Sequence, residues 1–210
     1  MADKLNMEKA IKLTQYELET MDTRPAGMCE LIANEEHFSR VIRDGMAKAR
    51  ISLDIMTADF KAMLVPLGRK GAKAKSVVEL FRTLAARGVE IRIMHAGTPS
   101  GPALVALKKI TAEETGAGAG RLTIRRCPRL HAKAVVIDSR VMYLGSANLT
   151  GAGLGAKGKE KRNFEMGIWT EAAGLIEGVM GQFNMLWEGD RCRKCRRKDV
   201  CPVPLEEPRL

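Results

Sequence analysis

The chain has 210 residues, a formal net charge of +10 and an isoelectric point near 9.6. This length is enough for one substantial α/β domain with a buried core and small terminal additions, and the positive charge favours a polyanionic partner, either nucleic acid or an anionic membrane surface. Because no apolar run approaches the roughly 20 residues that span a bilayer and the N-terminus lacks the apolar core of a signal peptide, we expect a soluble, cytoplasmic protein without a transmembrane segment.

The N-terminal part of the chain predicts an extension followed by a helix. Residues 1–31 are polar and charged, with loosely helical spacing of apolar residues, which indicates an N-terminal helical extension outside the core. The next helix is expected to begin at Asn34, because asparagine is a good N-cap and two glutamates follow it, and to end near Ala49. His37, in its first turn, is expected to be an ordinary surface or boundary histidine.

The middle of the chain alternates strands with helices, which is typical of a parallel βαβ unit with a right-handed crossover. Strands are expected over 50–56, 89–94 and 121–126, and helices over 76–87, 102–115 and 171–187. A flexible basic loop is expected over 68–75. Ligands gather beyond the carboxyl ends of parallel strands, and His95, which follows the second of these strands, is therefore a candidate substrate contact.

Residues 130–150 predict a pair of strands that carries polar groups at one end. The short β-branched run in this segment, AVVI, is typical of a buried strand. His131 and Lys133 are two residues apart and are expected to share a strand face. After a tight turn, the return strand is expected to bring a hydroxyl and an amide alongside them, those of Ser146 and Asn148.

The polar residues of this stretch resemble the HKD signature of the phospholipase D superfamily. The matching positions are His131, Lys133, Asp138, Gly145, Ser146 and Asn148, and the triplet Asn163-Phe164-Glu165 resembles the Asn-x-Glu element that follows the signature in that family. The alternative interpretation is an ordinary hairpin with a polar edge. The resemblance implies an α/β fold with a mixed, largely parallel sheet flanked by helices on both faces, and a catalytic domain over residues 32–189.

The residue types suit attack on a phosphodiester. Neutral imidazole is a competent nucleophile, and covalent catalysis splits one difficult displacement into two easier ones, so His131 is the expected nucleophile. Lys133, Asn148 and Ser146 supply donors to the phosphate oxygens on which charge develops. Glu165 is expected to hold the second imidazole nitrogen of His131 and to fix its tautomer.

The family resemblance implies a site built from two signatures, with one histidine as nucleophile and the other as general acid. This chain has one signature, since neither His37 nor His95 sits in a matching motif. We therefore expect a symmetric homodimer that joins two copies through the active-site face. Within this family Asp138 resembles a structural residue more than a reacting one, and the protein's own cations are expected to make a catalytic metal unnecessary.

Residues 190–210 are expected to form a basic, cysteine-rich tail. Three of its residues have the spacing C-x2-C-x5-C, which in a cytosolic protein favours metal ligation over disulfides: Cys192, Cys195 and Cys201. This spacing resembles the last three ligands of the four-cysteine iron-sulfur site in certain DNA glycosylases and nucleases. The resemblance implies a structural [4Fe-4S] cluster, with zinc as the alternative. Cys29 is the expected remote ligand, Cys127 is expected to be a buried strand residue, and a disordered basic tail with unpaired thiols remains the other interpretation.

Three functions remain open. The first is a metal-independent endonuclease on DNA or RNA, supported by the positive net charge and by the cysteine-rich tail. A basic run close to the signature also supports it, and the substrate contacts expected from this run are Lys157, Lys159 and Arg162. The second is a phospholipase D or phosphatidyltransferase acting on phospholipids, which the same signature serves equally well. The third is a non-catalytic nucleic-acid-binding or redox-sensing module, against which the intact signature argues.

Overall fold

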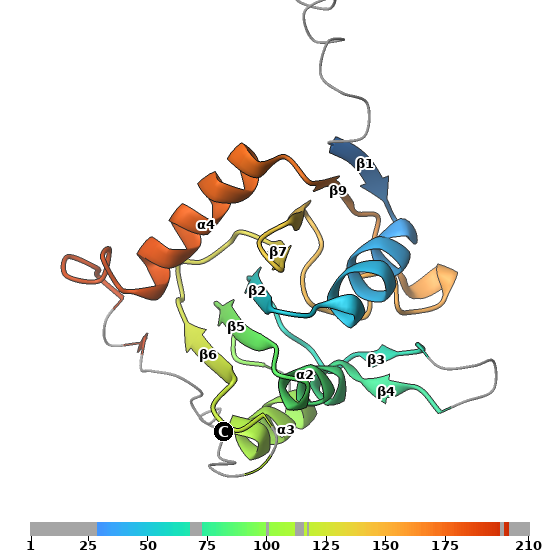
Figure 1. Ribbon diagram of the computed structural model, residues 1–210, viewed down its shortest axis with the longest axis horizontal. Coiled ribbons are helices and arrows are strands. Elements are labelled where there is room, and N and C mark those ends of the chain that lie inside the picture. Colours follow the sequence, from blue (N-terminus) through green and yellow to red (C-terminus); the bar gives the residue numbers. More distant parts are fainter. Residues whose placement is uncertain are drawn as a thin grey trace, which may run out of the picture.

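The computed structural model describes residues 29–67, 73–99, 101–111, 116, 118–197 and 200–201. Within these residues a 7-stranded sheet has the order β1-β9-β8-β7-β2-β5-β6 (Figure 1). Its strands are β1 (Cys29–Ala33), β2 (Ser52–Thr57), β5 (Glu90–His95), β6 (Leu122–Arg126), β7 (Ala134–Ile137), β8 (Val141–Gly145) and β9 (Met166–Thr170). A separate two-stranded sheet pairs β3 (Leu64–Val65) with β4 (Lys75–Ser76).

The main sheet is mixed. Strands β2, β5 and β6 are neighbours and run parallel, whereas the pairs β2 with β7, β7 with β8, β8 with β9 and β9 with β1 are antiparallel. It follows that β1, β2, β5, β6 and β8 point in one direction and that β7 and β9 point in the other. The expected mixed, largely parallel sheet is confirmed.

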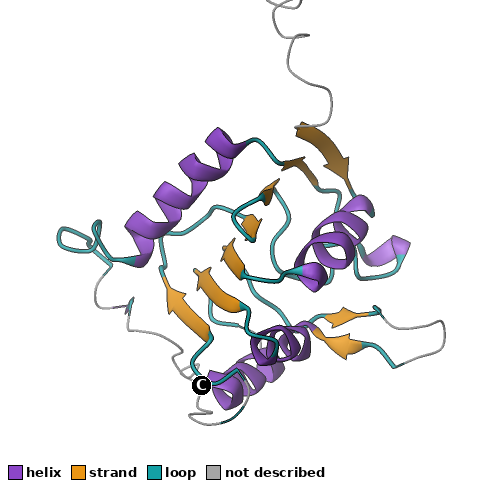
Figure 2. Cartoon of the chain, in the orientation of Figure 1, coloured by secondary structure: helices purple, strands orange, loops and turns teal. Residues whose placement is uncertain are grey.

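Helices cover both faces of this sheet (Figure 2). On one face lie η1 (Phe38–Gly45) with its continuation η2 (Met46–Lys48), α2 (Val77–Ala86) and α3 (Gly101–Thr111), and on the other lies α4 (Ala173–Trp187). The side chains of β2 alternate between these layers, because Leu53 and Ile55 belong to the core under η1 and α2, whereas Met56 packs with Phe183 and Trp187 of α4. None of the described helices is long and apolar enough to span a membrane.

Local sequence signals set the bounds of α2. The Ser76 side chain accepts a hydrogen bond from the Glu79 N–H at 3.1 Å, which satisfies one of the unpaired donors at the start of the helix. Gly88 follows the last turn with a φ of +96°, a conformation that glycine adopts without steric cost. The helix predicted over residues 76–87 is confirmed.

The helix predicted from Asn34 to Ala49 forms, but Asn34 does not cap it. Its φ is 49°, its backbone N–H donates to the Glu165 carbonyl at 2.9 Å, and its side-chain oxygen accepts from the Glu165 N–H at 3.2 Å. The buried side chains Val41, Ile42 and Met46 hold the helix on the sheet. Asn34 therefore fastens the chain segment before this helix to the segment that carries Glu165.

The sheet begins earlier in the chain than expected. Residues 29–31, which the sequence assigned to the N-terminal extension, belong to β1 and pair with β9 at one edge of the sheet. The rest of the predicted extension lies outside the described residues, as do residues 68–72 of the predicted basic loop and the end of the predicted tail after residue 201.

Candidate active site

The predicted strand pair of residues 130–150 is present as the antiparallel hairpin of β7 and β8. Asp138 and Ser139 form its turn, each with a φ of 53°. At the other end of the hairpin the Gly145 N–H donates to the Lys133 carbonyl at 3.1 Å, and this bond brings the segment after β8 alongside the residues before β7. The polar residues at both ends of the signature therefore meet near Lys133.

His131 and Lys133 are in contact as expected, although both lie before β7 rather than in it. The imidazole is exposed, whereas Lys133 is 8% exposed. The Lys133 ammonium donates to the His131 carbonyl at 2.7 Å and lies 3.2 and 3.3 Å from the two ring nitrogens. Burial lowers the pKa of Lys133, and the nearby charge of Glu165 partly opposes this shift. A cationic donor therefore lies directly beside an accessible imidazole.

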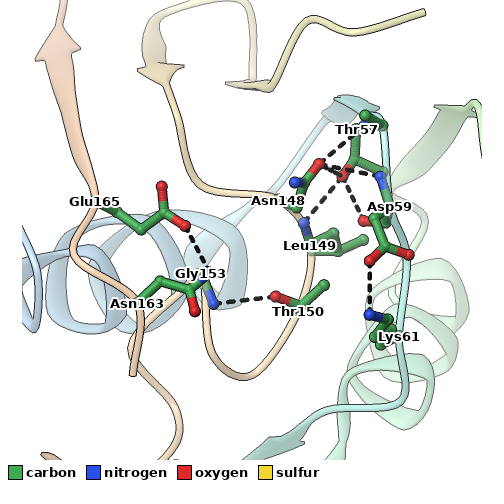
Figure 3. A network of polar contacts seen from close by, with 10 residues as sticks. Thr57, Asp59, Lys61, Asn148, Leu149, Thr150, Gly153, Asn163 and Glu165 are labelled. Atoms are coloured by element: carbon green, nitrogen blue, oxygen red, sulfur yellow. Dashed lines mark hydrogen bonds and ion pairs between the residues drawn. The ribbon is translucent and has the colours of Figure 1, made fainter. Parts of the chain in front are cut away.

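Asn148 is fixed by the loop that follows β2 (Figure 3). Its side-chain oxygen accepts hydrogen bonds from the N–H groups of Ala58 at 3.1 Å and Asp59 at 3.0 Å, and from the Thr57 hydroxyl at 3.3 Å. The same hydroxyl accepts from the Leu149 N–H at 2.9 Å. Because these contacts use the oxygen of the amide, the amide nitrogen of Asn148 is the end that remains to face a ligand.

Glu165 is held by Ser146 and Asn163. The Ser146 hydroxyl donates to one carboxylate oxygen, and the Asn163 amide donates to the other at 3.0 Å. Ser146 also pairs with Met166 through its backbone N–H, at 3.0 Å, and accepts from the Met166 N–H at 3.1 Å. The expected hydrogen bond from His131 to Glu165 is not made in the described structure, and the link of Glu165 to this pair is its negative charge, which opposes the lowering of the Lys133 pKa.

Two glycines make room for an aromatic ring behind these residues. Gly145 and Gly167 are paired across β8 and β9, and a Cβ on either would lie 2.4 to 2.5 Å from atoms of the Tyr143 ring or its hydroxyl. The Tyr143 oxygen accepts from the Ala147 N–H at 2.9 Å, and burial raises the pKa of the phenol to about 12. Gly145 is thus part of the signature for a packing reason.

His37 lies against the same ring and not on the surface, so the expectation of an ordinary surface or boundary histidine is wrong. It is 0% exposed, its ring meets Tyr143 edge-on at 5.2 Å, and its Nδ1 lies 3.0 Å from the Asn34 carbonyl. Burial lowers the pKa of His37.

Asp138 lies away from the contact of His131 with Lys133. The Asp138 carboxylate accepts from the backbone N–H groups of Arg50, Ile51 and Ser52 at 2.8 to 3.1 Å, at the end of β7 opposite Lys133. This position supports the structural role that the sequence favoured for Asp138.

The other predicted substrate contacts differ in accessibility. His95 is 1% exposed, with its Nδ1 2.8 Å from the Gly97 carbonyl, so in this structure it cannot touch a substrate. Lys157 and Lys159 are exposed, whereas Arg162 is mostly buried and pairs with Glu35 at 3.5 Å. Of these contacts, the two lysines remain accessible.

A groove of about 960 Å³ opens beside His131. Its cationic lining consists of Arg125, Arg126, Arg129, Arg191 and Lys194, and its apolar lining of Met94, Leu130, Leu186 and Trp187. The Arg125 guanidinium lies 4.6 Å over the Trp187 ring and donates to the Trp187 carbonyl, which holds this cation along the wall of the groove. An exposed imidazole therefore borders a concave, positively charged surface.

The cysteines do not group as the sequence suggested. Cys192, Cys195 and Cys201 line this groove together with Cys127, which follows β6 and is partly exposed rather than buried in a strand. Cys29 is in β1, at the opposite edge of the sheet from β6, so the assignment of Cys29 as their partner is corrected.

Sequence reasoning missed the residues that hold the candidate side chains in place. Thr57, Asn34 and Tyr143 orient Asn148, Glu165 and the Ser146 segment, respectively. Only Thr57 had a usable signal, since it ends a parallel strand where ligand sites gather. The other two act through residues far away in the sequence.

Comparisons with known proteins agree with this fold. The family model described as "Cardiolipin synthase, PLD-like domain" matches residues 42–187. No curated protein sequence matches the chain significantly.

Solved structures show the same fold at low sequence identity. Nuc, a phospholipase D family member from Salmonella typhimurium, is 18% identical, with a TM-score of 0.55 over 76% of this chain and 93% of that one. NucT from Helicobacter pylori is 16% identical, with a TM-score of 0.51 over 76% of this chain and 95% of that one. Phosphatidylserine synthase from Haemophilus influenzae Rd KW20 is 17% identical, with a TM-score of 0.52 over 75% of this chain and 38% of that one.

Proposed function

This chain belongs to the phospholipase D superfamily, whose PLD-like domain model matches residues 42–187, and from this premise we propose that it is a metal-independent phosphodiesterase that cleaves DNA or RNA. The observation that carries the proposal is the exposed His131 imidazole, in contact with the Lys133 ammonium at the border of a basic groove. The printed names of its structural neighbours include Nuc and NucT, but also a phosphatidylserine synthase.

The chemistry proceeds in two displacements. One ring nitrogen of His131 attacks phosphorus, a P–N bond forms, and the P–O bond to the leaving strand breaks while that oxygen takes a proton from a general acid. Water then attacks the phosphohistidine while the general acid, now deprotonated, takes a proton from it, the P–N bond breaks, and the imidazole is regenerated. Lys133 and the Asn148 amide nitrogen donate to the equatorial oxygens as negative charge accumulates on them. These donors supply the charge stabilisation that a metal provides in other phosphodiesterases.

The general acid in this proposal is His131 of a second copy. Exposed apolar side chains lie on β9, on the segment before it and on its neighbour β1, where Phe164 is 96%, Met166 65% and Leu31 68% exposed. Phe164 lies between Asn163 and Glu165, so a partner that covers it also closes over the active site. A two-fold axis here joins two half-sites into one and removes this apolar surface from water.

Two features of the groove bear on the substrate. Its five cations suit a polyanionic backbone, whose phosphates bind lysine and arginine with release of counterions. Its apolar lining, which includes Leu130 and Trp187, supports the alternative that the enzyme is a phospholipase D or a phosphatidyltransferase. Arg125 and Arg126 are held at the groove by hydrogen bonds to the carbonyls of Trp187 and Ala96, and for this reason we place nucleic acid first.

The substrate is tested with the purified chain in excess chelator. It should nick plasmid DNA or cut RNA, and His131→Ala should abolish the cleavage, whereas Arg140→Ala, an exposed change at the far end of the hairpin, should retain it. Activity on phosphatidylcholine or phosphatidylglycerol vesicles, with none on nucleic acid, would contradict the nuclease proposal and favour a phospholipase D or a phosphatidyltransferase. Absence of activity on all of these substrates would favour the non-catalytic module.

The shared site is tested by mass and by a variant of Phe164. Light scattering should give twice the mass of one chain, and Phe164→Glu should give single chains whose activity is lost although they remain folded. An active protein with the mass of one chain would contradict the two-copy site.

A further inference from the structure

The tail after α4 folds back against the end of β6. Gly189, with a φ of +82°, begins a series of turns in which the Cys192 N–H donates to the Gly189 carbonyl at 2.8 Å and the Cys195 N–H donates to the Cys192 carbonyl at 3.0 Å. The Cys201 thiol then donates to the Arg126 carbonyl at 3.3 Å, directly before Cys127. Residues about 65 or more positions apart in sequence thus bring their thiols to one place.

All four of these cysteines line the groove beside His131: Cys127, Cys192, Cys195 and Cys201. They are also electrostatic neighbours, because the pKa of the Cys201 thiol is raised first by burial and then by the nearby sulfur atoms of the other three. None of the four forms a disulfide within the described part of the chain. Two of them form a C-x2-C pair on a turn, which is the arrangement that zinc and iron-sulfur sites commonly use.

The surrounding charges suit thiolate ligands. The Arg129 guanidinium donates to the Cys195 sulfur at 3.8 Å, and Arg125, Arg126, Arg191 and Lys194 line the same groove. A metal bound by four thiolates carries net negative charge, and cations and hydrogen bonds to the sulfur atoms stabilise it. Among the described residues no three ligand side chains are already arranged as a metal site, so binding must draw the sulfur atoms closer together.

We propose that Cys127, Cys192, Cys195 and Cys201 bind a thiophilic metal centre, either zinc or an iron-sulfur cluster, that fastens the tail across the end of β6. The centre is a structural cross-link, here called the clasp, between the tail after α4 and the segment after β6, and it takes no part in phosphate chemistry. Because Cys127 is four residues before His131, the clasp holds both the segment that leads to the nucleophile and one wall of the groove. Disulfides among the same cysteines are the competing arrangement.

The metal content of the full chain tests this proposal without an activity assay. Protein purified anaerobically, without added metal, should contain about one zinc, or about four iron atoms with matching acid-labile sulfide, per chain. The matched variants are Cys127→Ser and Cys29→Ser, which separate the proposed ligand from the cysteine at the other edge of the sheet. Cys29→Ser should keep the full content, and Cys127→Ser should lose it at least ~10-fold, since a four-thiolate site loses a ligand.

Three results would overturn the proposal. These are metal content far below one equivalent in the wild type, full content in Cys127→Ser, and loss of metal in Cys29→Ser. If Cys127→Ser does not fold, X-ray absorption of the wild type decides, since sulfur ligands at about 2.3 Å support the site and nitrogen or oxygen ligands refute it. His131→Ala should keep its metal, so failure of the proposed activity and failure of the metal site can be told apart.

Discussion

The two ends of strand β7 carry residues of one sequence signature but differ in what those residues do. At one end the Asp138 carboxylate accepts hydrogen bonds from three backbone N–H groups of the segment before β2. At the other end the Lys133 ammonium faces an exposed imidazole and the charge of Glu165. The first arrangement saturates an anion with donors, and the second leaves an imidazole accessible beside a cation.

This difference shows that one signature combines a residue that holds the fold together with residues that we propose react with the substrate. A carboxylate that already accepts hydrogen bonds from three backbone N–H groups has little capacity left for a substrate, whereas the His131 side chain is exposed. Substitutions at the Asp138 end should therefore change stability, and substitutions at the His131 end should change activity.

The largest effect is expected for His131→Ala. Removal of the nucleophile should lower kcat by about 10³-fold or more, while the denaturant midpoint should stay within the error of the wild type because the imidazole is exposed. Cleavage assays with matched urea titrations measure both quantities. A large drop in stability would show that His131 also belongs to the scaffold.

Lys133→Met should have the next largest effect on rate. The substitution keeps most of the side-chain volume but removes the donor to the developing phosphate charge, which is worth roughly 10²-fold in kcat. Lys133→Arg is the matched control, since it retains a cation at the same position. If Lys133→Met kept wild-type kcat, the ammonium would serve only to position His131.

Asp138→Asn should affect folding rather than rate. Loss of the carboxylate that accepts from Arg50, Ile51 and Ser52 should lower the free energy of unfolding by about 2 kcal/mol, with the activity of the folded fraction unchanged. Urea unfolding followed by circular dichroism gives the first quantity and active-site titration the second. A rate loss at full occupancy of the native state would contradict the contrast between the two ends.

Ser146→Ala should have a smaller effect on rate. Without the hydroxyl that holds Glu165, the carboxylate becomes more mobile near Lys133, and a loss of about tenfold in kcat is expected. Asn163→Ala removes the other donor to the same carboxylate and should give a similar value. A clearly larger loss of kcat in Ser146→Ala than in Asn163→Ala would identify the Ser146 hydroxyl as a direct donor to the substrate.

The smallest effect concerns the two buried histidines. Burial lowers the folded-state pKa of His37 and His95 below the ordinary value of 6.5, so the unfolded chain binds protons that the native state does not. Their contribution to stability is complete above about pH 6.5 and declines as the pH falls from there toward their folded-state pKa. Urea midpoints between pH 7.5 and 5 should fall less steeply in a His37→Gln, His95→Gln double variant, and an unchanged slope would contradict this assignment.

The sequence alone predicted the local elements of this protein. The helix of residues 77–86, the strand pair around the turn at Asp138 and the contact of His131 with Lys133 all depend on residues near one another in the chain. Capping, alternation and turn chemistry act over a few residues, and for this reason such patterns can be read directly.

Only the tertiary structure decided how distant segments meet. The partners of Glu165 are Ser146, Asn163 and Asn34, the loop after β2 holds Asn148, and Cys127 rather than Cys29 lies with the cysteines of the tail. Each of these outcomes depends on the order of strands in the sheet, which places β8 between β7 and β9 and puts β1 and β6 at opposite edges. Strand order reflects the packing of the whole core and not the residues on either side of a site, so local patterns could not reveal it.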